Sequence, residues 1–140
     1  MARIIYNSII PFKGNKAITI LPFIFARNGA KPLGSDTVNH ESIHLRQQVE
    51  MLVVSAAVIV ILCLTADVSW WWMAAAPFCY FVMYITEYAI RFVAYGRAKD
   101  AYRNISTEQE AFANEKDFGY LKGRMPFAWV KYLTKKTYKR

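Results

Sequence analysis

Histidine and cysteine are scarce in this chain, since each occurs only twice in 140 residues. Cys63 and Cys79 lie inside apolar runs and lack the Cys-x-x-Cys spacing of thiol metal sites and redox motifs, so we expect buried free thiols. The first residues also lack the long apolar stretch of a signal peptide, so we expect no cleaved leader and no export. Any histidine chemistry must rest on His40 and His44.

Acidic residues are outnumbered, with 10 Asp and Glu against 18 Lys and Arg, and the net charge is +8. Such an excess is typical of proteins that bind nucleic acids or anionic membranes. No nucleic-acid-binding motif is visible, and the basic residues flank apolar runs. We therefore expect anionic lipid headgroups as partners and no nucleic acid.

Charge is missing altogether from two neighbouring runs, residues 51–66 and 68–86, which only Asp67 separates. As helices they would be about 24 Å and about 28 Å long, close to the thickness of the hydrocarbon part of a bilayer. This pattern favours a membrane hairpin. The alternative is a pair of helices buried in a soluble or oligomeric core.

The charges around this hairpin predict its orientation. Lys and Arg occur before and after it but not at its turn. By the positive-inside rule, both termini then face the cytoplasm, and the tryptophans at 70–72 form an aromatic belt at the far interface. The flanking cations are Arg27, Lys31, Arg46, Arg91, Arg97 and Lys99.

The segment before the hairpin predicts β-structure. A β-branched and aromatic run at 4–10 ends at Pro11, a turn follows at 12–16, and an extended pattern resumes at 17–25 with Pro22 inside it. A proline demotes that strand to a sheet edge. Such an edge can hold an extended peptide by strand addition, or the hairpin simply covers the core.

One short motif contains both histidines, His-Glu-Ser-Ile-His at 40–44. We expect a helix that starts near residues 35–37 and runs without a breaker to Asp67. Two imidazoles four residues apart project from one helix face and suit one metal ion, while Glu41 beside them can take a proton from water. The alternative is a solvated polar helix without a metal.

A second helix with metal-binding potential is predicted at 106–122, where Ser106 and Gln109 form a capping box and Gly123 ends the helix. Glu110 and Asn114 lie one turn apart on it. This arrangement lets a carboxylate bind a metal while an amide oxygen orients a ligating imidazole.

Together the two motifs resemble those of gluzincin-type zinc metallopeptidases, which have His-Glu-x-x-His on one helix and Glu-x-x-x-Asp on a later one. His40, Glu41 and His44 match the first motif, and Glu110 matches the second. Asn114 stands where that family has Asp, so it accepts an imidazole N–H without adding negative charge.

The resemblance implies Zn²⁺ held by His40, His44 and Glu110, Asn114 as an orienting residue, and Glu41 as the general base of peptide hydrolysis. The stretches at 39–41 and 101–106 are also similar to a small uncharacterised bacterial family, which brings no established activity with it. Together with the positive-inside rule, this resemblance leads us to expect a bacterial inner membrane with the site on its cytoplasmic side.

Several roles stay open at this point. Glu87 and Glu108 are alternative third ligands, although Glu87 is also spaced to form an ion pair with the arginine four residues on. A donor to the oxyanion is needed, and the candidates are Tyr102, Arg103 and Tyr120.

We expect residues 1–140 to form one minimal metallopeptidase-like domain, mainly α (α+β). Its expected parts are an N-terminal β-hairpin, the motif helix, an apolar helical hairpin at about 49–95, the third-ligand helix and a basic C-terminal helix at 127–140. That last helix either lies on an anionic membrane or is a tail docked by its aromatic residues.

The function expected is that of a membrane-associated zinc metalloendopeptidase acting on peptides or proteins. The first alternative is a non-catalytic membrane protein in which zinc holds the helices together. A third is a helical interaction module without a metal.

Overall fold

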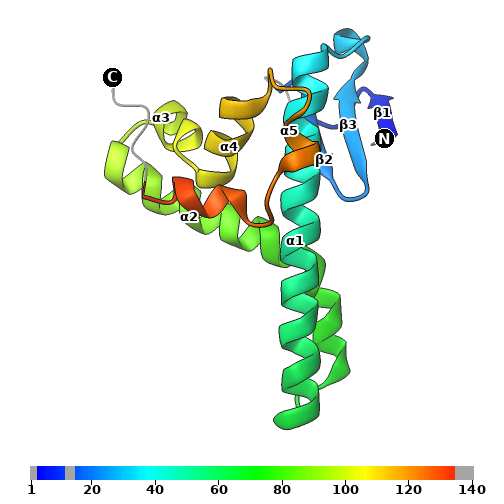
Figure 1. The fold of residues 1–140 in the computed structure, drawn as a ribbon, viewed down its shortest axis with the longest axis vertical. Coiled ribbons are helices and arrows are strands. Elements are labelled where there is room, and N and C mark those ends of the chain that lie inside the picture. Colours follow the sequence, from blue (N-terminus) through cyan, green and yellow to red (C-terminus); the bar gives the residue numbers. More distant parts are fainter. Residues whose placement is uncertain (1–2, 12–14, 135–140) are drawn as a thin grey trace.

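The computed structural model describes residues 3–11 and 15–134 (Figure 1). It is mainly helical with a small sheet near the N-terminus, so the predicted mainly α (α+β) class is confirmed. The strands are β1 (Arg3–Asn7), β2 (Ala17–Ile20) and β3 (Phe23–Arg27). The α-helices are α1 (Ser35–Thr65), α2 (Cys79–Tyr95), α3 (Ala98–Arg103), α4 (Ser106–Asn114) and α5 (Tyr120–Gly123). The 3-10 helices are η1 (Asn28–Ala30), η2 (Trp70–Phe78) and η3 (Ala128–Tyr132).

The sheet has the strand order β1-β3-β2, with β1 parallel and β2 antiparallel to β3. The segment at 17–25, predicted as one strand, is therefore two strands of a hairpin, and Pro22 lies in the turn between them. A proline fits this turn because it has no backbone N–H to give to a ladder. The strand β2 lies at the sheet edge, beside α1.

The helix α1 is continuous over 31 residues, which confirms the prediction that the histidine helix runs unbroken into the first apolar run. Its character changes along its length. Its buried residues, except Cys63, all lie between Asn39 and Gln48, where it passes through the globular head. Beyond Gln48 large apolar side chains such as Val53 and Ile61 are exposed.

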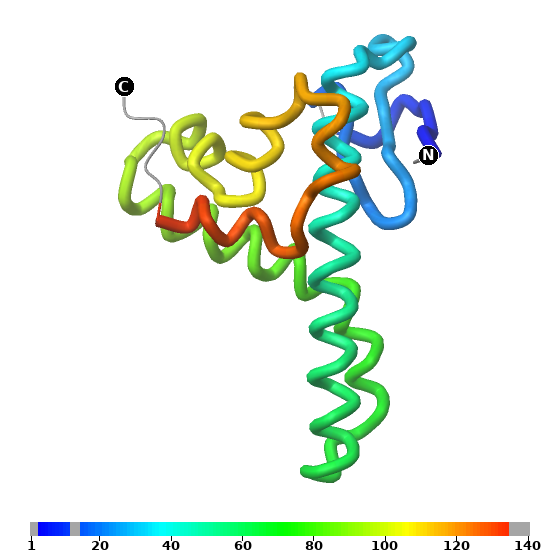
Figure 2. Tube along the Cα trace, in the orientation of Figure 1, coloured from blue at the N-terminus to red at the C-terminus, as the bar shows by residue number. Residues whose placement is uncertain are grey.

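The exposed half of α1 and η2 form a projecting hairpin, called here the stem (residues 49–78) (Figure 2). Ser69 caps the start of η2, because its side chain accepts a hydrogen bond from the backbone N–H of Trp71. Two helical segments, Ser35–Thr65 and Trp70–Tyr95, are long and apolar enough to cross a membrane.

From Cys79 onward the chain leaves the stem. The helix α2 turns away from α1 and runs under the head, so only residues up to Phe78 continue the hairpin that was expected at about 49–95 (Figure 1). The turn follows Pro77, at the end of η2. A proline removes one helical hydrogen bond, and this is where the helical path changes direction.

The helix α4 starts and ends differently from the prediction. Ser106 does not cap it; instead the Glu87 carboxylate accepts hydrogen bonds from the backbone N–H and the hydroxyl of Ser106, at 2.9 and 2.6 Å. Glu87 also pairs with Arg91 at 2.9 Å, which confirms the predicted ion pair. The Glu87 carboxylate thus provides a hydrogen-bond acceptor at the start of α4, where backbone N–H groups have no partner within the helix.

The predicted helix at 106–122 is broken after Asn114 and resumes only as α5. The side-chain amide of Asn39 donates to the backbone carbonyls of Asn114, Glu115 and Asp117, at 3.0 to 3.1 Å. Carbonyls at a helix end need such partners. A residue 75 positions away therefore stabilises the end of α4.

The C-terminal segment is docked on the head. Trp129 is buried and η3 packs against α4, whereas Val130 and Leu133 on the predicted membrane face are exposed. Residues 135–140 of the predicted C-terminal helix lie outside the described part of the chain. Both cysteines are free thiols, with Cys63 buried and Cys79 half-buried.

Candidate metal centre

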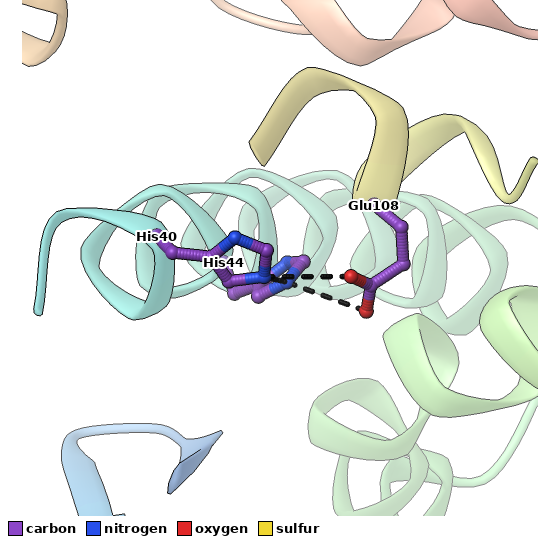
Figure 3. Close-up of side chains that lie close together, drawn as sticks. All are labelled: His40, His44 and Glu108. Atoms are coloured by element: carbon purple, nitrogen blue, oxygen red, sulfur yellow. Dashed lines mark hydrogen bonds and ion pairs between the residues drawn. The ribbon is translucent and has the colours of Figure 1, made fainter. Parts of the chain in front are cut away.

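Three side chains from two helices converge in the head: His40 and His44 of α1 and Glu108 of α4 (Figure 3). All three are at least nine-tenths buried. The two imidazole Nε2 atoms lie 3.1 Å apart. Nε2 of His40 lies 3.4 Å from Glu108 Oε2, and Nε2 of His44 lies 3.4 Å from Glu108 Oε1. The expectation that the two imidazoles share one helix face is confirmed.

These distances suit one metal ion. The two 3.4 Å distances end on different oxygens of Glu108, and one donor atom of each of the three residues lies within 4.8 Å of the other two. Donor atoms about 2.0–2.1 Å from zinc and separated by a tetrahedral angle are about 3.3 Å from each other. The carboxylate adds a second indication, because Oε2 of Glu108 is buried and has no hydrogen-bond partner among the described residues. Two imidazole nitrogens and one carboxylate oxygen suit a borderline divalent ion.

The far side of each imidazole meets an acceptor. Nδ1 of His40 lies 3.0 Å from Oε2 of Glu115, and Nδ1 of His44 lies 2.8 Å from Oε1 of Gln47. An acceptor at Nδ1 keeps one ring proton there, so Nε2 is the nitrogen that can bind a metal. Both Nε2 atoms face Glu108, and a metal ion bound there would replace the proton that His44 carries on Nε2.

Two tyrosines of α2 enclose the cluster. The Tyr84 hydroxyl donates to Oε1 of Glu108 at 2.8 Å, and the Tyr80 hydroxyl donates to Oε1 of Gln47 at 3.3 Å. Burial by itself opposes ionisation of Glu108, but the positive charge of the His44 imidazolium and the hydrogen bonds from both histidines outweigh it and hold the pKa of this carboxyl well below its usual range. Glu108 is therefore an anion near neutral pH. Burial likewise opposes the charge on His44, but the negative charge of Glu108 outweighs it and raises the pKa of His44 to about 9.

Glu110, the predicted third ligand, lies elsewhere. Its fully buried carboxylate is bound by Arg124 and accepts hydrogen bonds from the Tyr120 hydroxyl at 2.8 Å and the Gln47 side chain at 3.0 Å. Arg124 also pairs with Glu50. Glu108, the alternative, is the carboxylate that the fold brings to the histidines, whereas Glu110, two residues on and so on a different face of α4, meets Gln47.

Two further candidates lie away from the imidazoles. The Asn114 side chain donates to the carbonyl of Glu110 at the end of α4, and Glu115 takes the place expected for Asn114 beside His40. Glu87, the other alternative ligand, binds the start of α4 and Arg91.

The cluster formed by His40, His44 and Glu108 opens into a cleft of about 660 Å³. Glu41 lies in its wall, and one of its carboxylate oxygens accepts a hydrogen bond from the Thr19 hydroxyl of β2 at 2.7 Å. Tyr102 and Arg103 also line the cleft. Tyr120, the third candidate oxyanion donor, does not, because its hydroxyl is bound to Glu110.

The edge strand β2 forms another wall of the cleft, through residues 17–19. Part of its free edge is already occupied. The Gln48 side chain accepts from the N–H of Leu21 at 2.9 Å and donates to the carbonyl of Thr19 at 2.8 Å. Only the part of the edge toward Ala17 is therefore left to bind another chain.

The motifs did not point to four residues around the cluster: Gln47, Tyr80, Tyr84 and Glu115. Gln47 lies three positions after His44, on the same helix face, and Tyr80 and Tyr84 are hydroxyl-bearing residues one turn apart in an otherwise apolar run. That pattern was visible in the sequence. Nothing local distinguishes Glu115, whose backbone carbonyl is held by the distant Asn39.

Comparisons of this chain with protein-family models, with curated proteins and with solved structures find no match. The geometry of the cleft is therefore the only guide to function.

Proposed function

We propose that this chain is a membrane-associated zinc metallopeptidase in which His40, His44 and Glu108 hold Zn²⁺ and Glu41 is the general base. One observation carries the proposal: a cluster of three buried donors, a carboxylate beside it and a sheet edge all face the same cleft. A structural metal site has no need of the last two features.

Zinc in such a site supplies Lewis acidity, which activates water for hydrolysis. Within the chain, Glu41 accepts the proton of the attacking water and returns it to the leaving amine. The hydrogen bond from Thr19 fixes one oxygen of this carboxylate, so the other is oriented to exchange the proton.

The other cleft walls suit an extended peptide. The backbone of the peptide pairs with the free edge of β2 near Ala17 by strand addition. Gln48 blocks this edge at Leu21 and so limits the register in which the peptide can pair with β2. Tyr102 donates to the oxyanion, since burial and the negative charge of Glu108 raise the pKa of its phenol and keep it protonated. Arg103 lies in the same wall.

The proposal is tested with Glu41→Gln in the full chain purified in detergent without chelator. We expect wild type and variant to contain about one zinc per chain, because Glu41 is not a ligand. We expect the wild type to cleave members of a mixed peptide library and the variant to lose cleavage by roughly 10²-fold or more, since a general base contributes roughly 10²–10⁴-fold. Zinc is measured by elemental analysis and cleavage by mass spectrometry.

The matched control is Ser42→Ala, the next residue on α1, whose hydroxyl donates to the carbonyl of Val38 within the same helix. This variant should keep both zinc and cleavage. Loss of cleavage in Ser42→Ala as well would trace the effect to a disturbed helix. Full zinc with no cleavage of any peptide by the wild type would contradict the peptidase.

A second function is favoured by the burial of the donors. His40 and His44 belong to α1 and Glu108 to α4, so one ion would hold two elements together, as in a structural site. The same experiment distinguishes the two functions. In a structural site Glu41→Gln keeps zinc and changes no biological property.

We propose further that the stem lies in the bacterial inner membrane, with the head and both termini in the cytoplasm. The absence of Lys and Arg at the turn of the stem, near Asp67, supports this orientation. Single cysteines introduced at Lys31 and Val68, with Cys63 and Cys79 replaced by serine, test it. An impermeant maleimide added to intact spheroplasts should label position 68 at once and position 31 only after lysis. The reverse order would overturn the orientation.

A further inference from the structure

The helix α2 has two faces of opposite character. Tyr84, Glu87 and Arg91 point into the head, where they bond to Glu108, Ser106 and the carbonyl of Leu133. The other face carries large apolar side chains that are mostly exposed. These are Val82, Ile85, Ile90 and Val93, which are exposed by 63%, 64%, 64% and 85%.

The position of this apolar face relative to the stem is informative. The stem projects from one side of the molecule, and the elements bonded to α2 (α3, α4 and η3) lie on the opposite side of α2 (Figure 1). Since the polar face of α2 points to the head, its apolar face points to the side of the stem. Phe78, exposed by 63%, joins this face to the apolar surface of the stem.

We propose that α2 lies in the plane of the membrane, with its apolar face in the headgroup and acyl boundary of an anionic bilayer that the stem enters. An amphipathic helix of this kind is buried about 5–10 Å into that boundary. The continuity of the two apolar surfaces at Phe78 identifies lipid, which already surrounds the stem, as the occupant. The inference rests on the membrane placement proposed above and not on the zinc site.

Charge at the end of the helix agrees with an anionic surface. Arg97 and Lys99 follow α2 directly and are exposed. These two cations lie at the end of α2 that is farther from the stem, where they can attract anionic headgroups. The basic residues therefore bring the free end of α2 down to the lipid.

The placement of α2 determines where the cleft opens. Tyr80 and Tyr84 line the cleft, while Val82 and Ile85 of the same helix face the lipid. The cleft then lies about one helix diameter, roughly 10 Å, above the acyl boundary. A substrate bound there is a segment of chain next to the membrane surface.

The test measures depth in vesicles of phosphatidylcholine and phosphatidylglycerol. Single cysteines are placed at Ile85, Val93, Val58 and Asp36 of the full chain, with Cys63→Ser and Cys79→Ser. A nitroxide label at each reports its depth through the ratio of collisions with oxygen and with a water-soluble nickel chelate. Val58 in the stem is the deep reference, and Asp36 at the start of α1 is the aqueous reference.

We expect the labels at 85 and 93 to lie at the same depth, within a few Å, and just below the phosphates, as an in-plane helix requires. Aqueous labels at 85 and 93, as at 36, would overturn the proposal while Val58 remains deep. If α2 crossed the bilayer, the two labels would differ in depth by about 12 Å, and the proposal would also fall. A label at Val58 that is not in lipid refutes the membrane placement itself.

Two further measurements separate the remaining outcomes. In vesicles of phosphatidylcholine alone, the label at 93 should lie shallower than in vesicles that contain phosphatidylglycerol. An unchanged depth would overturn the proposed role of anionic lipid. If a second copy of the chain covered α2, the labels would be shielded from oxygen and broadened by each other at high protein density. That result would also overturn the proposal.

Discussion

At the scale of single residues, the two glutamates of α4 have separate tasks. Glu108 faces the imidazoles, and Glu110 is neutralised by Arg124, whose pKa is raised because the hydrogen bonds and charges of Glu110 and Glu50 outweigh the opposing effect of burial. A carboxylate that is already bound to a buried guanidinium gains little free energy by binding a metal ion instead.

Glu108→Gln and Glu110→Gln, compared side by side, should therefore affect zinc differently. We expect Glu108→Gln to purify without zinc, because an amide is a much poorer ligand than a carboxylate. Glu110→Gln should keep zinc and lose stability, on the order of 3 kcal/mol, because it leaves Arg124 partly unpaired. Elemental analysis and thermal melting measure the two effects. If Glu108→Gln kept zinc and Glu110→Gln lost it, Glu110 would be the ligand instead.

At the scale of elements, the ends of α4 are fixed by side chains from other helices. Glu87 of α2 binds its first turn, and Asn39 of α1 binds the carbonyls beyond its end. Because Asn39 comes directly before His40, the contact that ends α4 also holds Glu115 against the ring of His40. Helix length and the surroundings of the metal cluster are thus linked.

Asn39→Ala should loosen this link. It leaves the carbonyls of Asn114, Glu115 and Asp117 without their donor, which costs about 1–3 kcal/mol. We expect faster amide hydrogen exchange at 114–119 and a lower melting temperature. Ser42→Ala, which removes only a bond within α1, is the matched control. Equal exchange in the two variants would show that Asn39 does not hold this segment.

At the scale of the whole molecule, the cluster joins the long α1 to the part of the head that contains α4. An ion bound only by the folded state stabilises it by about 2.7 kcal/mol when the free ion is roughly 100-fold above its Kd. Removal of the ion should therefore loosen the head while the stem stays helical.

A chelator should lower the melting temperature of the head by roughly 5 °C or more, since 1 kcal/mol shifts a domain of this size by about 2–8 °C. The measurement is calorimetry of the full chain in lipid nanodiscs, with and without chelator. Glu41→Gln should melt and respond as the wild type does, whereas Glu108→Gln should not respond to the chelator. A wild type that is insensitive to the chelator would contradict a bound metal.

The sequence by itself determined the features that depend on neighbours along the chain. The two imidazoles share a face because four residues make about one helical turn, and α1 runs unbroken because residues 35–65 contain neither Pro nor Gly. The apolar runs predicted helices long enough for a membrane for the same reason.

Only the tertiary structure decided which carboxylate reaches the histidines, where α4 ends and how far the hairpin extends. Glu108 and Glu110 are two positions apart, so the choice between them depends on how α4 is rotated against α1, which contacts with Glu87, Arg124 and Asn39 set. These contacts join residues 14 to 78 positions apart along the chain, and no local pattern encodes them.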